Sequence, residues 1–171
     1  INTAVFSLVN ALLFRPLPHV QEPSTLAVLF SANGGRMGVA SYLDYVDFRE
    51  RTRTLDGFAA YKPLRMDLST EDSTQRIQGM IVTAEYFSVL GVSPVVGRFF
   101  TPEDNDEVGA ETVVVLGHDF WQTAFAGDRG VVGRTVRLNG RNFNVIGVAP
   151  EDFRGTLLEA RPALFAPMVM Q

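Results

Sequence analysis

Cysteine is absent from this 171-residue chain, which also holds only two histidines and one tryptophan. Without cysteine, the chain cannot form disulfides, thiolate metal sites or cysteine nucleophiles. The absence does not fix the compartment in which the protein works. The two histidines, His19 and His118, stand far apart, and neither lies in a metal-ligand spacing such as H-E-x-x-H. We therefore expect no metal site and no thiol chemistry.

Nucleotide-binding and calcium-binding motifs are missing as well. The chain contains no G-x-x-x-x-G-K-[ST] sequence, and the glycines from Gly127 to Gly133 are not followed by a phosphate-binding lysine. The acidic run Glu103–Glu107 departs from the calcium-loop pattern where Val108 and Gly109 stand. We therefore predict a solvated acidic loop and no bound cofactor.

The chain also lacks an excess of basic residues. Its formal net charge is −4 and its isoelectric point is near 5.1, whereas a protein that binds phosphate backbones carries clustered Lys and Arg. Nucleic acid is therefore not an expected partner. The hydrophobic content of 46% is enough for a real core, and the length fits one domain or two small ones.

No apolar run is long enough to span a bilayer alone. The chain opens with about 14 nearly uncharged residues before Arg15-Pro16-Leu17-Pro18, whereas a spanning helix needs about 20. It is also a poor signal peptide, because no basic residue precedes the run. Two interpretations remain: an amphipathic core helix, or the truncated end of a longer membrane helix with Arg15 at the water interface. The candidate membrane-facing or partner-facing residues are Val5, Phe6, Val9, Leu12, Leu13 and Arg15.

The first half of the remaining chain predicts short strands around two helices. We expect a strand at Leu26–Phe30, a flexible loop at Ser31–Gly35, and a helix that begins at Ser41 with Asp44 completing a capping box. That helix has a wide apolar face and places arginines near its C-terminal end. Further strands are expected at Phe58–Tyr61, Met66–Ser69 and Gln75–Val82, followed by a short helix that Thr83 caps and Gly91 ends.

The second half carries the clearer patterns. Thr101-Pro102-Glu103-Asp104 predicts a helical turn, Val113–Leu116 a strand buried on both faces, and residues 118–126 a helix. Asn139-Gly140 lies between two alternating segments within Thr135–Val148, which is typical of a type I′ hairpin.

The register of this hairpin follows from its turn. Pairing Leu138 with Arg141 places Val136 opposite Phe143, so that the apolar side chains share one face. The apolar run Ala163–Met170 predicts a final edge strand. Because strands and helices mix without strict βαβ alternation, the fold class is α+β with a mixed or antiparallel sheet.

Residues for covalent catalysis are hard to find. His118 is followed by Asp119 at a predicted helix start, where the acid complements the helix dipole. There is no G-x-S-x-G elbow. The alternative that stays open is a small esterase-like hydrolase, which requires a histidine within about 3 Å of a serine hydroxyl and a carboxylate in a pocket.

Three stretches carry a family resemblance: INTAVFSLVNALLFRPLP, YFSVLGVSPVVGRFFTPED and VVVLGHDFWQTAFAGDRGVVGRTVRLNGRNFNVIGVAPEDF. Together they resemble the MacB-like periplasmic core domain of bacterial ABC-transporter permeases, and within it the acidobacterial-type permease group. The combination of Tyr86-Phe87, Gly97-Arg98 and Val132-Gly133-Arg134 with Leu138-Asn139-Gly140 makes the likeness specific.

The resemblance implies the organisation and role of the chain. Residues 1–18 would be the end of a truncated transmembrane helix, and residues 19–171 an extracytoplasmic core domain that faces the periplasm from the bacterial inner membrane. That domain would combine a porter-like part with a β-rich inserted part and lack its C-terminal half, which would leave a sheet edge open to a second copy. It would transmit ATP-driven conformational change for export or mechanotransmission and perform no catalysis itself.

The resemblance also implies partners. They are a cytoplasmic ATPase domain or subunit, reached through membrane helices, and a periplasmic adaptor. Without its bilayer, the apolar N-terminal face must be covered, so we expect the isolated chain to self-associate through it or to fold it back onto the body.

Overall fold

The computed structural model describes residues 20–29, 31–33, 36–38, 41–69, 74–104, 112–156 and 161–168. Its α-helices are α2 (Tyr42–Arg51), α3 (Tyr86–Val89) and α4 (His118–Phe125), with 3₁₀ turns η1 (Pro23–Thr25), η2 (Pro102–Asp104) and η3 (Arg129–Val131). Its strands are β1 (Ser31–Asn33), β2 (Arg36–Gly38), β3 (Tyr61–Ser69), β4 (Thr74–Val82), β5 (Val96–Gly97), β6 (Val113–Leu116), β7 (Thr135–Leu138), β8 (Arg141–Val148) and β9 (Leu164–Pro167). Short helices around a mixed sheet confirm the α+β class.

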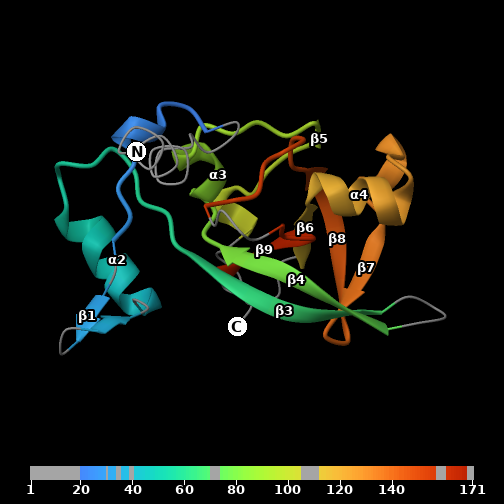
Figure 1. The fold of residues 1–171 in the computed structure, drawn as a ribbon, viewed down its shortest axis with the longest axis horizontal. Helices are drawn as coiled ribbons and strands as arrows, with labels where there is room; N and C mark the ends of the chain where they lie inside the picture. Colours follow the sequence, from blue (N-terminus) through green and yellow to red (C-terminus); the bar gives the residue numbers. More distant parts are fainter. Residues whose placement is uncertain are drawn as a thin grey trace, which may run out of the picture.

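The main sheet closes on itself into a barrel. Its seven strands have the order β5-β8-β6-β9-β4-β3-β7, and β7 also pairs with β8. The closing pairings are Leu68 with Leu138 and Ser69 with Arg137 between β3 and β7. Strand β5 stands outside the ring, against the end of β8. Figure 1 shows these strands together, with α2 and β1 to one side.

The β7–β8 hairpin confirms the predicted register. Leu138 pairs with Arg141 and Val136 with Phe143. Asn139 and Gly140 have φ values of 48° and 81°, as a type I′ turn requires at both central positions.

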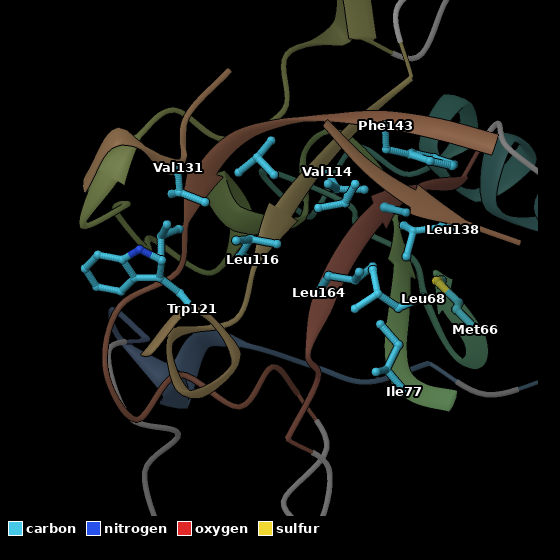
Figure 2. Close-up of a cluster of buried hydrophobic side chains, with 14 of the residues drawn as sticks. Met66, Leu68, Ile77, Val114, Leu116, Trp121, Val131, Leu138, Phe143 and Leu164 are labelled. Carbon is cyan, nitrogen blue, oxygen red and sulfur yellow. The ribbon is translucent and has the colours of Figure 1, made fainter. Parts of the chain in front are cut away.

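Apolar side chains alternate between the two faces of the strands and so form two hydrophobic cores. In β6, Val114 and Leu116 face the barrel interior, whereas Val113 and Val115 face the opposite side. Figure 2 shows Val114, Leu138 and Leu164, from three different strands, pointing toward one another in the interior core. The second core lies beneath α3, where Phe87 stacks on Phe99 with ring centroids 3.8 Å apart. The predicted burial of Val113–Leu116 on both faces is therefore confirmed.

The prediction of a final edge strand is wrong. Strand β9 lies inside the sheet, parallel to β4 and antiparallel to β6. All four of its residues are buried. Pro167, which suggested an edge, occupies the last position of the strand, where a missing N–H costs little. Residues 169 and 170 of the predicted strand lie outside the described part.

Other local predictions also need correction. Residues 26–29 form no strand, and the expected loop at Ser31–Gly35 contains β1, paired with β2. The two strands expected from Phe58 to Ser69 are one strand, because β4 pairs with it throughout. Thr83 does not cap α3: its hydroxyl accepts a hydrogen bond from the Ala60 N–H at 3.1 Å, and the N-cap residue is Glu85.

Among the described residues, only β4 pairs with β3 between Tyr61 and Asp67, so the other edge of this part of β3 carries no described strand. The Asp67 N–H and carbonyl bond to Asn139, on the side away from β4. The backbone hydrogen-bonding groups of successive residues point to alternate sides of a strand. Those of Tyr61, Pro63 and Arg65 therefore point away from β4, as those of Asp67 do. Proline has no N–H there, so this edge is a poor template for another strand.

Candidate functional surface

The predicted membrane-facing residues lie outside the described part of the chain, so their interpretation stays a prediction. They are Val5, Phe6, Val9, Leu12, Leu13 and Arg15. Over the residues that the structure does describe, no helix has both the length and the hydrophobicity needed to cross a bilayer.

His118 begins α4 and lies beside a shallow, charged depression. The depression is lined by His118, Asp119, Asp152, Phe153, Arg154, Arg161 and Pro162, and none of these is a serine. The His118 ring meets the Trp121 ring edge-on, with centroids 5.4 Å apart. The Asp119 carboxylate accepts from Arg161 Nη1 at 2.6 Å. The lining therefore supplies an ion pair at a helix start, and it does not supply the serine, histidine and carboxylate set that a hydrolase requires.

A polar network fixes the loop after β5. Arg98 donates from both terminal nitrogens to Asp104, at 2.6 and 2.9 Å, and the Thr101 N–H donates to the same carboxylate at 2.7 Å. Burial alone would raise the pKa of Asp104, but the Arg98 guanidinium and the Thr101 hydrogen bonds outweigh it and lower that pKa. The predicted helical turn here is confirmed as η2.

Tyr86 holds the chain that follows β8. Its hydroxyl accepts from the Thr156 N–H at 3.0 Å and lies 3.2 Å from the Thr156 hydroxyl. Burial raises the pKa of Tyr86 to about 12, although the bonds with Thr156 act in the opposite direction. The Tyr86 hydroxyl thus links α3 to the segment that follows β8.

Metal binding finds no support in the described part of the chain. No group of three or more His, Cys, Asp or Glu side chains there could hold an ion.

The exposed apolar side chains gather in the segment before β3. Of the large hydrophobic residues that stand exposed, Val28, Leu29, Tyr42, Leu43, Phe48 and Leu55 precede the barrel, whereas Leu64, Val95 and Val132 belong to the barrel and its loops. The wide apolar face predicted for α2 is thus mostly uncovered, and only Tyr45 in that helix is buried.

Glu85 joins this segment to the barrel, and sequence reasoning missed it. Its carboxylate accepts from the Tyr45 hydroxyl and from Arg49 Nη1, both at 3.2 Å. Tyr45 and Arg49 lie far from Glu85 along the chain, so no local pattern signals the contact.

A family profile for the MacB-like periplasmic core domain matches residues 1–171. The chain belongs to this family. It is thus a MacB-like periplasmic domain of the kind found in ABC-type transporter permeases, on the periplasmic side of a membrane transporter.

Solved structures agree on the fold of this MacB-like domain. The periplasmic region of MacB from Actinobacillus actinomycetemcomitans aligns with a TM-score of 0.60 and 22% identity, covering 74% of this chain and 55% of that one. The extracellular domain of the noncanonic ABC-type transporter YknZ from Gram-positive bacteria aligns with a TM-score of 0.57 and 16% identity, covering 72% and 60%.

A sequence relative carries the same family name. The macrolide export ATP-binding/permease protein MacB of Bdellovibrio bacteriovorus is 35% identical over 74 residues, which are 43% of this chain and 11% of that protein. The MacB-like domain therefore spans little more than half of the solved structures it matches and a small part of this relative.

Proposed function

We propose that this chain is the extracytoplasmic part of an ABC-transporter permease of the bacterial inner membrane, and that it transmits ATP-driven conformational change for export or mechanotransmission. The observation that carries the proposal is the family match over residues 1–171. The fold it shares with periplasmic regions of transporters supports the proposal. The domain acts through its surfaces and performs no covalent chemistry, in keeping with the depression beside His118.

The domain organisation follows from this role. Residues 1–18 are the outer end of a membrane helix, with Val5, Phe6, Val9, Leu12 and Leu13 toward lipid or a partner and Arg15 at the interface. Residues 19–171 are the core domain without its C-terminal half. The chain covers 55% to 60% of the matched structures, in keeping with a domain that is larger in those proteins.

The partners we propose are an ATPase domain or subunit on the cytoplasmic side, reached through the membrane helices, and a periplasmic adaptor. The Bdellovibrio relative, which is named an ATP-binding and permease protein, supports the first of these.

The isolated chain should also self-associate through its N-terminal residues. Replacing Phe6 and Leu13 with glutamate is expected to shift the mass measured by light scattering toward the monomer. A mass unchanged by both substitutions would argue against N-terminal association.

Cysteine labelling in cells tests the location. Since these 171 residues contain no cysteine, a Gln122→Cys substitution on the exposed side of α4 adds the only thiol of this domain, and the unaltered full-length protein gives the background labelling. A membrane-impermeant maleimide is expected to label this thiol in intact spheroplasts. The matched control is Val114→Cys, which is fully buried and should react only after unfolding. Labelling of Gln122→Cys only in lysed spheroplasts would refute a periplasmic location.

A further inference from the structure

The turn that ends α3 requires glycine at position 91 for two reasons. The Val92 N–H donates to the Phe87 carbonyl at 3.0 Å, and the next bond back runs from the Gly91 N–H to the Ser88 carbonyl, also at 3.0 Å. These bonds form a Schellman motif, which holds Gly91 at a φ of +65°. In addition, a Cβ at Gly91 would lie only 2.7 Å from the Cβ of Gln21. Gly91 is therefore constrained both by its own turn and by a segment far earlier in the chain.

Gln21 also supplies a hydrogen-bond donor to the end of α3. Carbonyls in the last turn of a helix have no donor within that helix. The carbonyl of Leu90, the C-cap residue, accepts from the Gln21 N–H at 3.0 Å. The backbone of Gln21 thus holds the same turn that its side chain contacts at Gly91.

Residues 20–26 form a compact segment, which we call the strap. Val20 and Leu26, at its two ends, both pack against the second core. Between them, the Glu22 carbonyl accepts from the N–H and from the hydroxyl of Thr25, each at 2.9 Å. Because these internal bonds fix the spacing of the two ends, we expect the contacts at both ends to form and break together.

The helix on which the strap rests is itself rooted in the second core. Tyr86 and Phe87 of α3 are each only 1% exposed. The Phe87 ring stacks on Phe99, and the Tyr86 hydroxyl bonds with Thr156. A displacement of the strap is therefore passed through α3 to the loop after β5 and to the segment after β8.

We propose that the strap docks on the C-terminal turn of α3 as one unit and that Gly91 is the positioning residue of this contact. The proposal rests on the proposed function in one respect. If residues 1–18 are the end of a membrane helix, the strap is the first part of the domain that follows them, and their movement enters the second core at Leu90 and Gly91. This assigns a role to the centre of the family stretch YFSVLGVSPVVGRFFTPED.

Hydrogen exchange of the full-length protein, measured in peptides that cover the strap, tests the role of Gly91. Gly91→Asn retains a residue that tolerates positive φ but adds a Cβ against Gln21. The strap amides are expected to exchange at least about tenfold faster, with the amides of β4 and β6 unchanged. The matched control is Gly133→Asn, where φ is +88° and a Cβ meets nothing. It should leave strap exchange within about twofold.

Removal of the opposing side chain tests the cause of this effect. Gln21→Gly keeps the N–H that bonds to Leu90 but removes the Cβ that an asparagine at position 91 would overlap. In this background, adding Gly91→Asn should change strap exchange by less than about twofold. An acceleration as large as in the presence of Gln21 would overturn the assignment of Gly91.

Leu26→Ser tests whether the strap behaves as a unit, and it leaves α3 unaltered. It removes the apolar contact at the far end of the strap, and the Gln21 amide is expected to exchange at least about tenfold faster. An acceleration confined to residue 26 would overturn the proposal, as would unchanged strap exchange in Gly91→Asn. Equal acceleration in β4 and β6 would also overturn it, because the strap would then open only with the barrel. This readout uses neither ATP nor transport, so its failure is distinct from failure of the labelling test of the proposed function.

Discussion

Asn139 and Asp67 close the barrel by a reciprocal pair of hydrogen bonds. The Asp67 N–H donates to Asn139 Oδ1 at 2.9 Å, and the Asn139 N–H donates to the Asp67 carbonyl at 2.8 Å. The β3–β7 ladder beside them pairs only Leu68 with Leu138 and Ser69 with Arg137. The turn residue of one hairpin thus serves as the clasp on the neighbouring strand.

Two substitutions at Asn139 separate the contribution of its side-chain hydrogen bond to Asp67 from that of its turn conformation. Asn139→Gly keeps the positive φ but removes the side-chain acceptor, and should lower the free energy of unfolding by about 1 kcal/mol. Asn139→Ala loses the acceptor and adds left-handed strain of about 1 to 2 kcal/mol. Urea unfolding followed by the fluorescence of Trp121 measures both. Equal losses in the two variants would contradict the role assigned to the turn conformation.

Substitutions at Gly117 and Gly133 separate two costs of adding a Cβ, which are steric overlap at Gly117 and backbone strain at Gly133. A Cβ at Gly117 would overlap the Pro162 carbonyl oxygen, although its φ of −71° is ordinary. A Cβ at Gly133 would meet nothing, but its φ is +88°. Gly117→Ala is therefore expected to cost about 3 kcal/mol or more, and Gly133→Ala about 1 to 2 kcal/mol. Urea midpoints in the reverse order would refute this assignment.

Ionisation of Asp104 makes the free energy of unfolding depend on pH in the acid range. Its pKa is lowered from the ordinary value of 3.8, so its contribution to stability is complete above that value and disappears as pH falls through the lowered pKa. Asp104→Asn should cost about 1 to 3 kcal/mol at neutral pH, and the difference from the unaltered chain should shrink toward pH 2.

Thermal unfolding from pH 2 to pH 7 measures this difference. The control is Asp67→Asn, which removes the exposed pair with Arg76 and should change stability by less than about 1 kcal/mol. A constant gap between Asp104→Asn and the unaltered chain at all pH values would contradict the linkage.

Pro63 should limit pairing of another strand with the β3 edge that faces away from β4. Pro63→Val restores an N–H that points away from β4, and we expect more dimer in concentrated solution by light scattering. Leu64→Val is the control, because the Leu64 N–H points toward β4. An increase in dimer with Leu64→Val but not with Pro63→Val would count against this account of the edge.

Sequence patterns correctly predicted the elements that depend only on residues close together in the chain. The Asn139-Gly140 turn needs only two residues that tolerate positive φ, and the capping box of Ser41 and Asp44 needs only a spacing of three. The alternation in Thr135–Val148 gave the β7–β8 register for the same reason. Recognition of the family also succeeded from the sequence, because its motifs are contiguous.

Predictions failed where long-range partners decide the outcome. Residues 26–29 are apolar enough for a strand, but none of the described strands pairs with them. Thr83 is a residue type that caps helices, yet its hydroxyl accepts a hydrogen bond from the Ala60 N–H instead. Strand β9 is internal because β4 and β6 enclose it, and its own sequence contains no information about them.

The α+β class, the absence of thiol chemistry and the periplasmic family follow from the amino-acid sequence, since composition and contiguous motifs carry these properties. Closure of the sheet into a barrel and the hydrogen bonds from Tyr45 and Arg49 to Glu85 emerge only in the folded domain. The physical reason is that strand pairing and side-chain docking join residues distant in the chain, whose meeting depends on the packing of the whole domain.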